Sequence, residues 1–209
     1  YQEPYRKHIT SPGLFRIKHG LPPNKKIIGI SSSFPQAKFA LRNSEFHKRD
    51  WKDLQISLDP EEVAIRELDR FRWFQHRIEA ISLAYPHYTI AVKPHPMEDV
   101  SMWKQFCRDN GINLILNDYA HNFINAVDIL VTRAGCLTAC EAWLLGKDSV
   151  QITTEELREG AAKESLEYSM KYVNDLSLFD NSPVNPNWRE YLKRYGLDTR
   201  DASKKCAIE

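Results

Sequence analysis

The chain has 209 residues, which is enough for one substantial domain or for a domain with an appendage. Its hydrophobic content of 42% and charged content of 27% are ordinary for a globular protein, and its formal net charge is only +1. The small net charge excludes a global field for nucleic acid or an anionic membrane surface, and no apolar run reaches the length of a membrane span. Recognition of any anion must therefore come from local geometry.

Residues 1–25 are polar and contain four prolines, so we expect an arm or linker outside the core. Residues 26–33 predict a buried strand that ends in three serines. Residues 34–59 lack clear periodicity and are predicted to form a loop with a short helix. Asp59 then caps the most clearly predicted helix, whose apolar stripe continues until Pro86 stops it.

The rest of the predicted domain alternates strands and helices. Strands are predicted over 88–92, 112–116, 128–131 and 149–152, and helices over 100–110, 119–126 and 136–145. This alternation indicates right-handed crossovers and a parallel sheet with helices on both faces. We therefore predict an α/β, Rossmann-like domain over 26–152, followed by a helical carboxyl-terminal extension of the same domain over 153–209.

The cysteines indicate neither a disulfide framework nor a zinc site, because no C-x-x-C pattern occurs. Cys136 and Cys140 are four residues apart in a predicted helix, which suits packing better than metal ligation. Together with the lack of a visible signal peptide, this favours a reducing, cytoplasmic compartment. The chain begins with Tyr1 and its last residues stop within a helical pattern, so we expect a piece of a longer protein. The four cysteines are Cys107, Cys136, Cys140 and Cys206.

The segment IAVKPHPMED, residues 90–99, predicts a buried strand that runs into a rigid polar corner. Lys93 and His95 are two residues apart in an extended chain, so their side chains are expected to converge on one anion. The flanking Pro94 and Pro96 fix the backbone around His95. As a hydrogen-bond donor, His95 could stabilise negative charge on a phosphate leaving group, and an ordinary surface or core histidine is the alternative.

A second strand–turn–helix, residues 128–147, has the same form. Gly135 permits a close backbone approach and the first helical N–H groups lack internal partners, so this turn is predicted to bind phosphate. Arg133 would add a fork-shaped charge, and Thr138 a hydroxyl. Glu141, on the same helix face as Thr138, could accept hydrogen bonds from two ribose hydroxyls; the alternative is a plain turn with Glu141 in a salt bridge. Because ligands of open parallel sheets lie beyond the carboxyl ends of strands, both corners should face one crevice.

Together, these motifs resemble the carboxyl-terminal, donor-binding half of a GT-B glycosyltransferase. KPHP after a strand, a small-residue turn, a helix bearing Glu-Ala and then LLGK are similar to bacterial surface-carbohydrate and capsule enzymes. These include polysialyltransferases, Kdo transferases and the glycerophosphotransferases of teichoic acid synthesis. The resemblance covers about residues 26–152. It implies binding of a nucleotide-activated sugar, a CMP- or other NDP-sugar, and a glycan acceptor, with an amino-terminal GT-B domain opposite this one.

The resemblance further implies that no metal ion, other cofactor or nucleic acid takes part, and it is compatible with peripheral membrane association through other regions. It places the HP motif on His95, as the catalytic residue, and Pro96, and it assigns ribose binding to Glu141. This chain has Ala-Gly-Cys where relatives carry serines or threonine, which leaves backbone donation at that turn. Ser31, Ser32 and Ser33 either touch donor or acceptor or serve only the turn. The predicted substrate-binding residues are Lys93, Pro96, Ser31, Ser32, Ser33, Arg133, Ala134, Gly135, Cys136, Thr138 and Glu141.

Two other functions stay open at this point. A sugar-nucleotide epimerase-like enzyme has the same architecture, but it needs an acid/base set that the sequence does not reveal. A degenerate, non-catalytic module that binds a partner or polysaccharide is favoured by Ala-Gly-Cys in place of the serines. In the transferase interpretation the acceptor site and the catalytic base belong to the amino-terminal domain, so the isolated chain is expected to be inactive.

Overall fold

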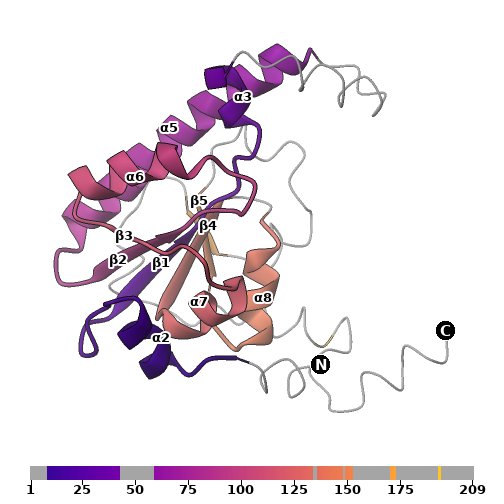
Figure 1. Cartoon of the computed structure of the whole chain (residues 1–209). Helices are drawn as coiled ribbons and strands as arrows, with labels where there is room; N and C mark the ends of the chain where they lie inside the picture. Colours follow the sequence, from indigo (N-terminus) through magenta and orange to yellow (C-terminus); the bar gives the residue numbers. More distant parts are fainter. Residues whose placement is uncertain are drawn as a thin grey trace, which may run out of the picture.

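The computed structural model describes residues 9–42, 59–133, 136–147, 149–152, 170–172 and 193. Within these residues, six strands form one all-parallel sheet in the order β3-β2-β1-β4-β5-β6. This sheet, with helices on both faces, confirms the predicted α/β, Rossmann-like fold (Figure 1). The strands are β1 (Ile27–Ser31), β2 (Thr89–Lys93), β3 (Asn113–Leu114), β4 (Ile129–Arg133), β5 (Ser149–Ile152) and β6 (Met170–Tyr172).

Helices form a layer on each side of the sheet. Helices α3, α5 and α6 lie over one face, and α2, α7 and α8 lie over the other (Figure 1). Side chains of a strand alternate between the two faces, so Ile28 and Ile30 of β1 enter the core under α5 and α6, while Ile27 enters the core under α2 and α7. The helices are α2 (Pro12–Lys18), α3 (Ala37–Arg42), α5 (Pro60–Ala84), α6 (Val100–Asp109), α7 (Ala120–Ala126) and α8 (Thr138–Leu144).

The long helix α5 begins and ends where local signals predict. The side chain of Asp59 accepts a hydrogen bond from the backbone N–H of Glu61, and Pro60 occupies the first turn, where its missing N–H costs nothing. The helix ends at Ala84, two residues before Pro86. Its apolar stripe packs on the sheet, because Phe74, Ile78 and Ile81 are fully buried. None of the described helices is both long and apolar enough to cross a membrane.

The first described residues include a helix that packs into the core, where the sequence predicts an arm or linker. Residues 12–18 form α2, capped by the Ser11 side chain, and its Phe15 is 0% exposed in the core beneath α7. Arg16 fastens this helix to the sheet through an ion pair with Asp128, at 3.1 Å between Nη2 and Oδ2. The prediction of a linker outside the core is therefore wrong for this helix. A seven-residue helix has too few turns for its one buried aromatic to appear as a periodic pattern.

Two further boundaries differ from the predictions. Residues 170–172 pair with β5 as a sixth strand, inside the stretch predicted to be helical. Three residues are too few to produce a readable period, so only the neighbouring strand selects this conformation. Helix α8 begins at Thr138, two residues later than predicted, and the N–H groups of residues 139 and 140 bond to carbonyls three residues earlier. The other residues of the predicted extension 153–209, apart from 193, lie outside the described ranges.

The strand order determines where a ligand can bind. From β1 the chain crosses to β2 and β3 on one side, and it then returns to β4 on the other side of β1. Helices that leave β1 and β4 therefore lie on opposite faces, and open α/β sheets bind ligands beyond the carboxyl ends of two such strands. Gly29, in the middle of β1, lets α7 pack closely, because a Cβ there would lie 2.5 Å from Cγ1 of Val127.

Candidate functional site at the carboxyl ends of β1, β2 and β4

A row of polar residues crosses the sheet near the carboxyl ends of its strands. Lys93 is in register with Ser31, Ser31 with Thr132, and Thr132 with Gln151. Ala91 and Leu130 belong to the core beneath α7 and α8, so Lys93 and Thr132, two residues further along each strand, point to that same face. Polar residues thus replace the apolar core where the strands reach their carboxyl ends.

Helix α8 brings its own polar side chains to this row. The hydroxyl of Thr138 lies 3.2 Å from the hydroxyl of Ser31 and also contacts the thiol of Cys136. This contact joins the end of β1 to the first turn of α8 across the strand-order switch. It is one pairing of predicted site residues, far apart in sequence, that the fold brings together.

Glu141 lies one turn after Thr138 and is half-buried. Within the described part of the chain, its Oε2 atom is buried and has no hydrogen-bond partner. Burial raises the pKa of this carboxyl group above its ordinary value. The predicted alternative, a salt bridge to a neighbouring side chain, is absent among the described residues. Buried acceptors are nearly always satisfied in proteins, so a donor from water or from a ligand would complete the hydrogen bonding of this oxygen.

Arg133 is engaged by a partner that sequence reasoning missed. Its two terminal nitrogens bind the carboxylate of Glu67 on α5, with Nη1–Oε2 at 2.9 Å and Nη2–Oε1 at 2.7 Å. Nη1 also donates to the carbonyl of Ser33, and the guanidinium lies 4.6 Å from the centre of the Phe34 ring. A fork already filled by a carboxylate is not free for a phosphate in this structure. Arg133 instead ties the end of β4 to α5 and to the loop after β1.

The corner after β2 holds His95 in a defined orientation. The backbone N–H of Met97 donates to Nδ1 of His95 at 3.2 Å, and the carbonyl of His95 accepts from the N–H of Glu98 at 2.9 Å. A neutral histidine that accepts at Nδ1 carries its proton on Nε2. The corner thus presents an N–H donor of the kind that binds a phosphate oxygen.

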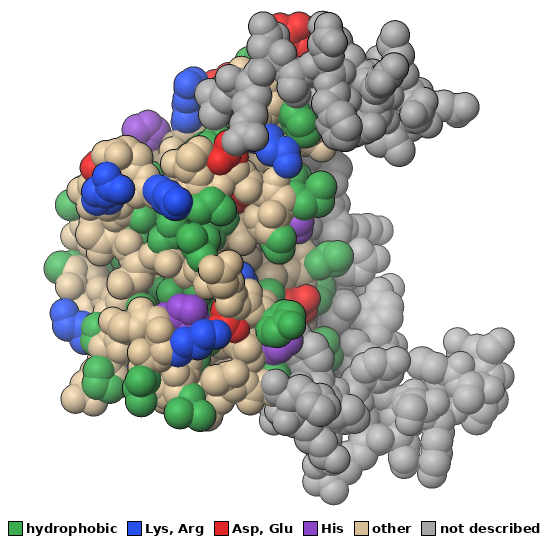
Figure 2. Space-filling model, in the orientation of Figure 1, with side chains coloured by type: hydrophobic (Ala, Val, Ile, Leu, Met, Phe, Trp, Pro, Cys, Tyr) green, Lys and Arg blue, Asp and Glu red, His purple; other side chains and the backbone are tan. Residues whose placement is uncertain are grey.

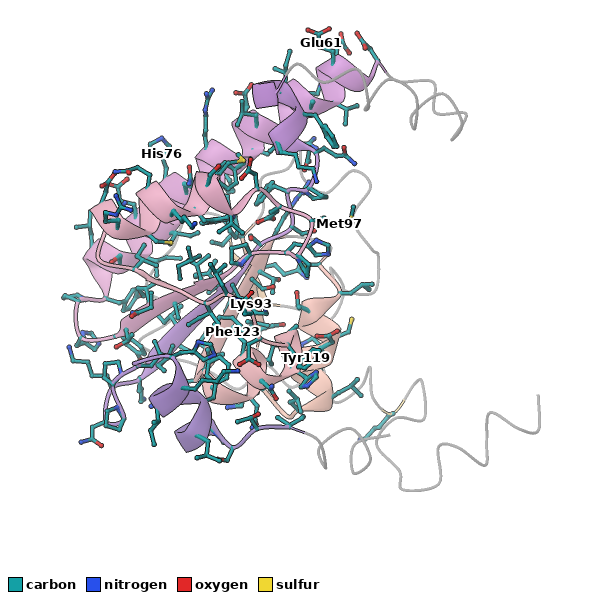
Figure 3. All side chains as sticks on the ribbon, in the orientation of Figure 1. Glu61, His76, Lys93, Met97, Tyr119 and Phe123 are labelled. Carbon is teal, nitrogen blue, oxygen red and sulfur yellow. The ribbon has the colours of Figure 1, made fainter. Side chains whose placement is uncertain are left out.

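Lys93 ends β2 on the α7 side of the sheet, near the loop after β3 (Figure 3). Burial lowers the pKa of its ammonium group, while the negative charge of Asp118 acts in the opposite direction. Asp118 is itself buried, which would raise its pKa, but hydrogen bonds from Lys18, Asn122 and His19 outweigh burial and hold that pKa below the ordinary value. Lys93 is therefore a partly desolvated cation beside an anion. That its side chain and the His95 side chain converge on one anion stays a prediction.

The three serines after β1 have separate roles. Ser31 contacts Thr138, as described above, and the Ser33 carbonyl accepts from Arg133. Ser32 is 1% exposed, and its hydroxyl donates to Oε2 of Glu98 at 2.6 Å. Because the hydroxyl of Ser32 is buried and committed, it is not available for direct contact with a ligand in this structure. Glu98 carried no periodic or motif signal of its own in the sequence.

Of the predicted site residues, Ala134 and Gly135 lie outside the described residues. The others lie at or just beyond the carboxyl ends of β1, β2 and β4, or in and directly before the first turn of α8. The exposed Met97 and Tyr119 lie on the loops after β2 and β3, on either side of Lys93 in Figure 3. Thr132, Gln151 and Glu98 are additions from the structure; the first two could have been found from strand alternation, once the burial of both faces is known.

The face of the molecule shown in Figure 2 carries no patch of positive charge of the kind that binds a long polyanion. On the face shown in Figure 2, Lys and Arg side chains are scattered over several elements and do not gather into one patch. Within the ranges given above, no group of three or more His, Cys, Asp or Glu side chains is placed to hold a metal ion. The features of the site are therefore local: one histidine donor, one half-buried lysine, a hydroxyl pair and one carboxylate oxygen that has no partner in the described part of the chain.

No protein-family model matches the chain, and no curated protein matches it significantly.

Proposed function

We propose that this chain is the nucleotide-sugar donor-binding domain of a GT-B glycosyltransferase that builds a surface polysaccharide or capsule. The nucleotide lies beyond the carboxyl ends of β1 and β4, with its ribose at Glu141 and its phosphate toward His95. The observation that carries the proposal is the buried Oε2 atom of Glu141 at the strand-order switch, which has no hydrogen-bond partner among the described residues.

Ribose suits Glu141 for a physical reason. A desolvated carboxylate without a donor is costly, and a pair of neighbouring hydroxyl groups can supply two donors to it. Thr138 lies one turn earlier on the same helix face as Glu141. Its hydroxyl and that of Ser31 continue the polar groups toward the end of β1. A pentose with adjacent hydroxyl groups therefore fits this position better than an apolar ligand or a second carboxylate does.

The phosphate would lie at the neighbouring corner. His95 offers an Nε2–H donor, because Met97 occupies Nδ1, and Lys93 adds a partly desolvated positive charge nearby. A donor that is fixed before the reaction stabilises the charge that develops as the sugar leaves the phosphate. In this proposal the acceptor and the catalytic base belong to a second domain, which faces the crevice from the other side.

The test is a calorimetric titration of the chain with CMP, CDP, UDP and GDP. We expect one of these nucleotides to bind, with a cytidine nucleotide favoured by the resemblance, and we expect no sugar transfer from this chain alone. Absence of binding at millimolar nucleotide, in a protein that also contains the second domain, would refute the proposal. Transfer activity from the isolated chain would refute the division of roles between the two domains.

A nucleotide-binding module without turnover is the second candidate. The pairing of Arg133 with Glu67 favours it, because this pairing removes one cation from the predicted phosphate site. Product analysis with the complete protein and a nucleotide-sugar separates the two: transfer or hydrolysis of the sugar supports the enzyme, and binding without any product supports the module.

A further inference from the structure

We propose that Glu98 is a positioning residue, which holds the serine loop after β1 and the His95 corner after β2 in one fixed arrangement around the nucleotide. This inference rests on the proposed function, since it concerns the geometry of the same site. The serine loop comprises residues 31–34, and the His95 corner comprises residues 93–98. Glu98 is 8% exposed, so its carboxylate faces the protein and not the solvent.

The contacts of Glu98 connect three elements. Its Oε1 atom accepts from the backbone N–H of Phe34, and its Oε2 atom accepts from the Ser32 hydroxyl at 2.6 Å and from Nε1 of Trp103 at 2.7 Å. Its own N–H donates to the carbonyl of His95 at 2.9 Å. A single residue thus bonds to the serine loop, to helix α6 and to the backbone of His95, which is the residue proposed to bind the phosphate.

The chemistry of the three donors demands a carboxylate. Phe34 N–H and Trp103 Nε1–H can donate but cannot accept, and each points to a different oxygen of Glu98. A glutamine in this place would turn its amide NH₂ toward one of these N–H groups whichever way the amide is oriented. Glu98→Gln therefore keeps the size of the side chain and still breaks the connection on one side.

Burial alone does not explain why an acid is retained here. A buried charge is costly, and an apolar residue of similar size would fill the same space without that cost. A carboxylate that accepts two or three hydrogen bonds restricts the groups around it to one geometry. The groups restricted here belong to the two segments that follow the carboxyl ends of β1 and β2, which is why we assign Glu98 to the site and not only to the core.

The experiment compares wild type, Glu98→Gln and Asp99→Asn in the complete chain, with CMP and UDP as probes. Asp99 is the matched control: it is the adjacent acid and caps α6 through Ser101, at 3.0 Å to the N–H. We expect Glu98→Gln to bind the nucleotide about tenfold more weakly, as expected for the loss of one hydrogen bond that orders the site. Asp99→Asn should bind it as wild type does.

A second measurement separates positioning from a purely structural role. Trp103 is 0% exposed and lies on α6, and its indole N–H reports on Glu98 directly. The indole signal in a proton–nitrogen correlation spectrum, assigned with Trp103→Phe, should shift as nucleotide is added to the wild type, with the same dissociation constant as calorimetry. The shift should vanish in Glu98→Gln. If Glu98→Gln fails to fold, Ser32→Ala removes the 2.6 Å bond and should reduce both responses.

The failures are distinguishable. If neither the wild-type chain nor a protein that also contains the second domain binds CMP, CDP, UDP or GDP, the proposed function and this inference fail together. A second outcome overturns the role of Glu98 alone. In this outcome wild type binds the nucleotide, Glu98→Gln or Ser32→Ala binds it with unchanged affinity, and the Trp103 indole signal does not shift when nucleotide is added.

Discussion

Glu141→Gln is the substitution that most directly tests the candidate site, because it keeps the shape of the side chain and removes its charge. A hydrogen bond to a charged group contributes about 1.5–3 kcal/mol. At about 1.4 kcal/mol for each tenfold change, the loss of one such bond weakens nucleotide binding about 10- to 150-fold. We expect at least the lower value, since the Oε2 atom has no other partner among the described residues.

Although Glu141→Gln should weaken nucleotide binding, it should not lower the stability of the folded protein and should raise it at high pH. Burial raises the pKa of Glu141 in the folded protein, so between the ordinary carboxyl pKa and this raised pKa the folded state binds more protons than the unfolded state. Stability from this group therefore decreases as pH rises through that interval, and the cost of the buried charge is complete above it. Glutamine carries no such cost. The variant should melt at the same or a higher temperature than wild type at pH 8, and the difference should shrink toward pH 4.

The assay combines calorimetric titration with thermal unfolding at several pH values. A 2′-deoxynucleotide provides an independent check. It should bind to wild type more weakly than the ribonucleotide does. Glu141→Gln should bind both nucleotides with the same affinity, because the substitution and the missing hydroxyl remove the same hydrogen bond. Glu62→Gln is the matched control, since Glu62 is an exposed acid of α5 that pairs with Arg66. A large fall in melting temperature with unchanged affinity would refute the ribose role and would make Glu141 a structural residue.

Two other predictions concern the phosphate corner and the amino-terminal helix. His95→Ala should lower kcat/KM for sugar transfer by the complete protein by about two orders of magnitude, with a smaller loss of nucleotide affinity, because a preorganised donor acts mainly in the transition state. His95→Gln should retain part of the activity. Normal activity of His95→Ala would remove His95 from the mechanism. Phe15→Ala should lower the free energy of unfolding by about 3–5 kcal/mol in a denaturant titration, as for other fully buried aromatic residues; a change below 1 kcal/mol would mean that α2 is the loosely attached arm predicted from sequence.

Elements that depend on local chemistry can be predicted from the amino-acid sequence. Asp59 and Pro60 predict the start of α5, and Gly111 and Gly146, both with positive φ, follow the ends of α6 and α8. Runs of apolar residues bounded by turns predict β1, β2, β4 and β5 to within two residues. The two polar corners were also visible, because a parallel sheet places the ends of its strands along one edge.

Which charged and polar groups meet depends on the packing of distant segments and cannot be predicted from local patterns. Arg133 could equally serve a phosphate or a carboxylate, and the fold selects Glu67, 66 residues away. Glu98 gains its role from Ser32, also 66 residues distant, and from Trp103, whose ring direction is set by packing on the sheet. One oxygen of Glu141 is buried without a hydrogen-bond partner among the described residues, which the sequence does not show. Such choices depend on distances across the fold, which no local pattern of residues records.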